Sequence, residues 1–172
     1  MNRRLWVALC LMGMSAASDP TRAQGLDRSM KGQYVAVRDW VREAAARMPE
    51  ANYDFKPTPD VRSFGQLVGH IANSVAMICS VPMGTPSPLS SDAEKLPTKA
   101  ALVSALDAAF SACDKSWAAV APEWATAPVS LFGSTVSKMD ALSFNNTHTY
   151  EHYGNVVTYL RLKGIVPPSS PR

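Results

Sequence analysis

Apolar side chains recur every three or four residues in several separate stretches of the chain. One face of the first stretch, residues 26–48, carries six of them: Met30, Tyr34, Val37, Val41, Ala45 and Met48. Side chains at this spacing share one face of an α-helix, and charged residues occupy the positions between them. The stretch therefore predicts an amphipathic helix that ends at Pro49.

The second and third helices are predicted from a start signal followed by an apolar stripe. Ser63 with Gln66 forms a capping box, and the stripe that follows it is Phe64, Leu67, Val68, Ile71, Val75 and Ile78. Thr98 can cap the third helix, whose stripe is Leu102, Leu106, Phe110, Cys113, Trp117 and Val120. Pro122 is expected to end this helix.

Two connections in the second half of the chain differ in kind. Residues 81–97 contain four prolines and a glycine, which indicates a long irregular loop. Such loops are often functional, so both a lid and a plain surface connection stay open. Residues 126–136 alternate apolar and polar positions about Gly133-Ser134, which predicts a short hairpin or an extended crossover.

The last helix is expected to run from the capping box of Ser137 and Asp140 to about Lys163. Gly164 and then Pro167-Pro168 follow in the order typical of a helix end. Four helices with little strand predict an all-α fold, a four-helix bundle.

The N-terminus resembles a secretory signal. Arg3 and Arg4 precede an apolar run from Leu5 to Met14 that is too short to span a bilayer, and Thr21-Arg22-Ala23 is typical of a cleavage site. We therefore expect residues 1–23 to be a signal peptide and residues 24–172 to be one domain of an exported, periplasmic protein. Cys10 lies too early to leave a lipid anchor after cleavage, so no stable membrane anchor is expected.

Cleavage changes the charge. It removes three arginines and one aspartate from 17 basic and 14 acidic residues, which leaves a net charge of about +1. The pI of 8.8 is therefore no argument for a nucleic-acid partner. Cys79 and Cys113 remain after cleavage, and an exported pair could form a disulfide. Both lie in apolar stripes, where a lone cysteine behaves as a small hydrophobe, and this favours separate buried cysteines over a bridge.

The three histidines of the chain carry the candidate chemistry. His148 and His152 are four residues apart and share one face of the last helix, and His70 lies in the second helix. Both faces also carry apolar residues, so all three side chains are expected to point toward the bundle interior. Three histidines on facing helices can hold a divalent ion with an open coordination position. Ordinary hydrogen-bonded core histidines are the alternative.

Longer segments around these histidines resemble the DinB-like (DinB/YfiT) metalloprotein superfamily. The resemblance rests on Lys56-Pro57, residues 62–72 (RSFGQLVGHIA), residues 146–155 (NTHTYEHYGN), Tyr159-Leu160-Arg161 and Gly164. It implies an up-down-down-up four-helix bundle in which His70, His148 and His152 bind a divalent ion, often zinc or nickel. Glu151, Tyr153 and Asn155 stand where the family pattern often has His, Arg and Gln.

The function expected from this resemblance is that of a metal-dependent enzyme, hydrolytic on a small molecule. Tyr34, Met77 and Tyr159 are the candidate pocket residues, and Glu151 is either a partner of the ligands or a solvated charge. A thiol-dependent S-transferase is an alternative, which the oxidising environment outside the cytoplasm disfavours. A non-enzymatic metal-binding bundle is another, because the sequence shows no carboxylate beside the ligands to act as a base. A homodimer through an exposed helix face is compatible with all three.

Overall fold

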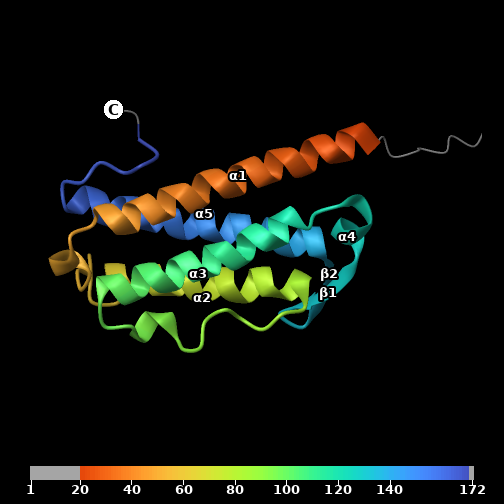
Figure 1. The fold of residues 1–172 in the computed structure, drawn as a ribbon. Helices are drawn as coiled ribbons and strands as arrows, with labels where there is room; N and C mark the ends of the chain where they lie inside the picture. The colour runs from red at the N-terminus through yellow and green to blue at the C-terminus, as the bar shows by residue number, and fades with distance from the viewer. Residues whose placement is uncertain (1–19, 171–172) are drawn as a thin grey trace, which may run out of the picture.

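Four long helices lie side by side and form the bundle (Figure 1). The computed structural model describes residues 20–170, and the four helices are α1 (Pro20–Arg47), α2 (Phe64–Ser80), α3 (Lys99–Ala118) and α5 (Lys138–Leu162). In Figure 1, α1 and α5 run in one direction, and α2 and α3 run in the other. The predicted up-down-down-up bundle is therefore confirmed.

The parallel pair α2 and α3 needs a connection that returns along the length of the bundle. Residues 81–98 make it, with two short 3₁₀ helices, η2 (Val81–Met83) and η3 (Ala93–Lys95). A third 3₁₀ helix, η1 (Glu50–Asn52), lies between α1 and α2. The return segment starts at the hairpin end of the bundle and brings η3 back beside α2 (Figure 1).

The predicted helix starts are present as hydrogen bonds. Ser63 Oγ accepts from the backbone N–H of Gln66, whose side chain accepts from the backbone N–H of Ser63. Ser137 and Asp140 form the same capping box at the start of α5, and Thr98 caps α3 through the N–H of Ala101. Each cap satisfies backbone donors that would otherwise lack a partner.

Three element boundaries differ from the prediction. α1 begins at Pro20 rather than near residue 26. α3 ends at Ala118, and Pro122 starts a further short helix, α4 (Pro122–Thr126), instead of ending the third one. Proline fits the first turn of a helix because its missing N–H would be unpaired there. The predicted signal peptide lies outside the described residues except for residues 20–23, which belong to α1.

A two-stranded antiparallel hairpin precedes α5, as expected. Its strands are β1 (Pro128–Leu131) and β2 (Ser134–Ser137), with Leu131 paired to Ser134 across a two-residue turn. Both turn residues have positive φ, 51° at Phe132 and 81° at Gly133, which is the type I′ pattern. A residue other than glycine in this left-handed region costs about 1–2 kcal/mol, because its Cβ lies too close to the backbone.

Cys79 on α2 and Cys113 on α3 form a disulfide, so the expectation of two separate cysteines is wrong. Their Cα atoms are 4.9 Å apart, within the normal range for a bridge. The two apolar stripes do bury the cysteines, but they also face each other across parallel helices. Periodicity predicts that a residue is buried and does not predict which buried residue it meets.

The core fills the space between the four helices and is built from the predicted stripes. Of its largest fully buried side chains, those from the predicted stripes include Val37, Val41, Ile71, Leu106, Phe110 and Trp117, and α5 adds Leu142 and Leu160. Burying one such side chain contributes about 1.5–3 kcal/mol. The segment Phe64–Met83 is apolar and long enough to cross a membrane, but 67% of its most apolar window is buried inside the bundle, as in a core helix.

Candidate metal centre

His70, His148 and His152 meet where α2 packs against α5. One ring nitrogen of each lies within 4.8 Å of the corresponding nitrogens of the other two. The Nε2 atoms of His148 and His152 are 3.1 Å apart, and the His70 ring lies edge-on to the His152 ring with centroids 4.6 Å apart. Helical spacing on α5 and the packing of α5 on α2 thus bring together all three sequence-predicted histidines.

A carboxylate that the sequence analysis missed holds His70. Glu94 Oε1 lies 2.8 Å from Nδ1 of His70, and Glu94 Oε2 accepts a hydrogen bond of 3.0 Å from Nε of Arg62. An ionised carboxylate only accepts hydrogen bonds, so Nδ1 of His70 carries a proton, and Nε2 is the nitrogen left to bind an ion. The pair is the carboxylate–histidine arrangement that commonly orients metal ligands.

The return segment places Glu94 by packing tightly on α2. The side chain of Asn73 accepts from the backbone N–H of Ala93 and donates to Asp92, which fixes η3 on the helix. Gly69 allows the close approach, because a Cβ there would lie 2.6 Å from the carbonyl oxygen of Ala93. The segment predicted as either a lid or a surface connection is therefore anchored here and contributes to the site.

The environment keeps the histidines of α5 neutral. Burial, together with the neighbouring His148 and His70, lowers the pKa of His152 to about 4. Burial also lowers the pKa of His148. Burial alone would raise the pKa of Glu94, but hydrogen bonds from Arg62 and His70 outweigh it and lower the value. Near pH 7 the site thus has two neutral imidazoles on α5 and one ionised carboxylate, which suits a cation.

The geometry fits a divalent ion. Two imidazole nitrogens that bind one zinc ion at about 2.0–2.1 Å with tetrahedral angles are about 3.3 Å apart, close to the 3.1 Å between His148 and His152. Nε2 of His152 is the nitrogen that approaches His148, whereas its Nδ1 is buried and has no hydrogen-bond partner among the described residues. His70 is the histidine whose second nitrogen has a carboxylate partner.

The three candidate pocket residues have different surroundings. Tyr34 is buried between α1 and α3, where its hydroxyl donates to Asp114 and to the carbonyl of Phe110, so the structure does not bring it to the histidines. Tyr159 donates a 2.6 Å hydrogen bond to the carbonyl of Arg62, the residue that pairs with Glu94. Met77 lies on α2 with 39% of its surface exposed.

Glu151 is exposed on α5 and acts on the histidines only as a nearby charge, so of the two readings offered for it the solvated charge applies. Glu94 instead supplies a carboxylate beside His70, which the sequence did not reveal. No spacing rule links it to His70, since it lies in an irregular segment 24 positions further along the chain. The acidic residues of 92–94 in a proline-rich loop were the only signal.

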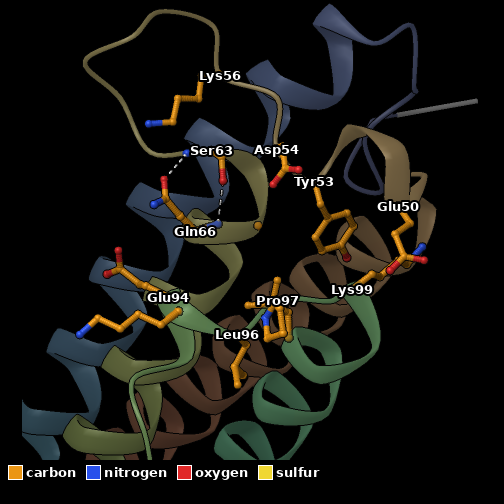
Figure 2. A pocket seen from close by; sticks show the side chains of 13 residues that line it. Glu50, Tyr53, Asp54, Lys56, Ser63, Gln66, Glu94, Leu96, Pro97 and Lys99 are labelled. Carbon is orange, nitrogen blue, oxygen red and sulfur yellow. Dashed lines mark hydrogen bonds between the residues drawn. The ribbon is translucent and has the colours of Figure 1, made fainter.

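A cavity of about 420 Å³ lies at the start of α2 (Figure 2). None of the histidines lines it, but Glu94 does, together with Lys56, Gln66 and Lys99. Lys99 already donates to the carbonyls of Ala46 and Met48 at the end of α1. Glu94 therefore contacts both this cavity and His70.

Comparison with known proteins places the chain in a family. The sequence profile of the DinB superfamily matches residues 33–156. A DinB-like protein from Bacillus cereus has a TM-score of 0.73 at 13% identity, over 84% of this chain and 97% of the other. A DinB-like protein from Bacillus subtilis has a TM-score of 0.63 at 20% identity, over 84% and 96%.

A third solved structure carries an enzyme's name. A mutant of mycothiol-dependent maleylpyruvate isomerase has a TM-score of 0.60 at 12% identity, over 78% of this chain and 65% of its own length. No curated protein sequence matches. At these identities the solved structures show the fold, whereas the profile covers most of the chain. The chain belongs to the DinB superfamily.

Proposed function

We propose that this protein is an exported, divalent-metal-dependent enzyme that hydrolyses a small molecule. The observation that carries the proposal is the convergence of three imidazoles, with His70 fixed through Nδ1 by Glu94. A histidine that only fills a core does not need a carboxylate that aims its second nitrogen at two other histidines. His70, His148 and His152 would hold the ion, and zinc or nickel suits three imidazole donors.

An ion held by His70, His148 and His152 would keep its Lewis acidity, because imidazole ligands add no charge, and would supply activation of a carbonyl or of water. The protein's own residues have separate roles. Glu94 keeps the proton of His70 on Nδ1, and Arg62 keeps Glu94 ionised. Because both Glu94 oxygens are engaged, Glu94 is a positioning residue for His70 rather than a free base.

Export is the second part of the proposal, and the buried Cys79–Cys113 disulfide supports it. Disulfides persist in oxidising compartments such as the periplasm and are rare in the cytosol. The basic and apolar N-terminal segment supports the same location.

A thiol-dependent transferase is the second candidate, favoured by the fold shared with a mycothiol-dependent isomerase. The same disulfide argues against it, since low-molecular-weight thiols are scarce where such bridges are stable. A bundle that only binds or stores metal is the third candidate, because both oxygens of the one carboxylate beside the ligands are already bonded.

Metal content is the deciding measurement. The mature protein without a purification tag is dialysed and analysed for bound elements, beside His148→Ala and Gly154→Ala, a change on the same helix away from other atoms. We expect about one ion per chain in the wild type and in Gly154→Ala, and almost none in His148→Ala. No bound metal in any of them, even after incubation with zinc and nickel, would refute the metal centre.

Hydrolysis is tested separately on the loaded protein. A panel of esters, amides and lactones is compared with the same panel plus a low-molecular-weight thiol. Turnover that needs the metal but no thiol supports the hydrolase, and turnover that needs both supports the transferase. A loaded protein that turns over neither set would favour the storage role.

A further inference from the structure

Phe132, at the tip of the β1–β2 hairpin, is a bulky residue in an unusual position. It is the first residue of a type I′ turn and has a φ of 51°, a place usually taken by asparagine, aspartate or glycine. Its side chain is 67% exposed, so core packing does not account for it. A strained backbone that presents a large apolar group to solvent is more common at functional sites than elsewhere.

The ring of Phe132 is the outermost of three rings in contact, which start at His148. It lies edge-on to the ring of Phe144 with centroids 5.6 Å apart, and Phe144 is stacked on the imidazole of His148 at 5.9 Å and 25°. Phe144 is itself 41% exposed. Two aromatic side chains thus form a surface that begins at a histidine of the site and ends at the hairpin tip.

The hairpin is held firmly enough to position this surface. Leu131, directly before Phe132, is buried against Ile78 of α2 and Ala141 of α5. Alternate residues of a strand point to opposite sides, so Leu131 anchors the hairpin between the two helices while Phe132 stays outside. Phe144 lies one helical turn before His148 on the same face of α5.

The two sides of the metal centre differ in character. Toward the start of α2 lie Arg62 and Glu94, which are charged and paired with each other. Toward the hairpin lie Phe144 and Phe132, and Met77 lies in the same direction because it follows His70 by two turns on α2, which runs opposite to α5. A ligand that reaches the histidines therefore meets a charged pair on one side and exposed aromatic side chains on the other.

We propose that Phe132 and Phe144 form a subsite for an aryl or alkyl group of the substrate, beside the histidines. The inference rests on the proposed metal-dependent function and adds the substrate class: a small molecule with an apolar group next to the bond that reacts. The direct stacking of Phe144 on His148 ties this surface to the metal centre and favours a substrate over a second copy of the chain, which would cover the histidines.

The test uses two chelating probes that differ in one group, benzohydroxamate and acetohydroxamate. Their affinities are measured by calorimetry on the zinc-loaded protein, for the wild type, Phe132→Asn and Leu162→Asn. Asparagine suits the positive φ of the turn, so Phe132→Asn removes the ring without harming the hairpin. Leu162 is 58% exposed at the far end of α5 and is the matched control.

We expect the wild type and Leu162→Asn to bind the aryl probe about tenfold more tightly than the methyl probe, and Phe132→Asn to lose most of this preference. The affinity for acetohydroxamate should be the same in all three. An equal aryl preference in wild type and Phe132→Asn, or none in the wild type, would overturn the subsite.

A second readout does not need the metal. On the metal-free protein, saturation-transfer NMR should detect the phenyl protons of benzohydroxamate with the wild type and not with Phe132→Asn. If no metal binds, the proposed function fails while this measurement still decides the subsite. A wild-type dimer that dissociates in Phe132→Asn, seen by sedimentation velocity, would assign the surface to a second copy instead.

Discussion

Glu94 lies 2.8 Å from Nδ1 of His70, although it belongs to an irregular segment and His70 to a helix. Removing this carboxylate should weaken metal binding without unfolding the bundle. We expect Glu94→Ala to lower zinc affinity about 10–100-fold, the usual effect of losing a ligand's hydrogen-bond partner. Competition with a chromophoric chelator measures it.

Glu151→Ala is the matched control for this prediction. Glu151 is next to His152 in sequence and acts on His148 as a charge, but it is exposed and outside the hydrogen-bond network. Its removal should change the affinity less than about threefold, since exposed charges are screened. Equal losses in both variants would mean that only charge matters, not the orientation of His70.

The metal-free protein should lose stability as the pH falls from about 6.5 toward 4. The pKa of His152 falls from 6.5 to about 4 on folding because the ring is buried beside two other imidazoles. In this window the unfolded chain binds a proton that the folded chain excludes, so stability rises with pH. We expect a loss of about 2 kcal/mol between pH 7.5 and pH 5 from this residue.

Urea denaturation with a chelator present, at several pH values, measures this loss. His152→Gln cannot titrate and should flatten the profile, although His148 leaves a smaller slope in the same direction. A wild type and a His152→Gln variant with parallel profiles would contradict the assignment.

Gly69→Ala should destabilise the protein and also weaken metal binding. The added Cβ would lie 2.6–2.7 Å from backbone atoms of Ala93 and Glu94, which cannot yield without moving the return segment. We expect a loss of about 1–3 kcal/mol, typical of overpacking. Thermal unfolding and the chelator competition report the two effects.

Gly154→Ala adds the same methyl group but should change the stability of the protein in the opposite direction. Gly154 lies inside α5 with nothing within 4 Å of the added Cβ. Alanine should therefore stabilise the helix by about 0.5–1 kcal/mol. If Gly69→Ala proved as harmless as Gly154→Ala, the tight packing of η3 on α2 would be disproved.

Removing the disulfide should cost stability but not the site. The bridge closes a loop of 34 residues between α2 and α3, which corresponds to about 3–4 kcal/mol in the chain-entropy description. Cys79→Ala with Cys113→Ala should unfold at lower urea concentration and still bind one metal ion. The reduced wild type should behave like the double variant, and an unchanged midpoint would contradict the prediction.

Local signals in the sequence predicted most of the fold. Ser63, Thr98 and Ser137 cap helices through contacts with residues three positions away, so their roles are visible in a short window. The pair of His148 and His152 is of the same kind, because helical geometry alone places the two side chains on one face.

The missed features depend on contacts between distant segments. Glu94 reaches His70 only because the connection from α2 to α3 runs back along the bundle. Cys79 meets Cys113 because two stripes happen to face each other. Tyr34 was expected at the pocket, but its buried side chain on α1 packs on α3 instead. Periodicity gives the buried face of a helix and not its neighbour.

His70 lies on α2, before the long return segment, and the other two histidines lie on α5, the last helix. This order would also determine when the proposed metal ion can be bound. In an unfolded chain only His148 and His152 are close in sequence, so the proposed set of three ligands would be complete only after α5 has docked on α2. A chain exported before folding would therefore take its ion from the metals available outside the cytoplasm. The compartment of folding, rather than the three imidazoles alone, would select the metal.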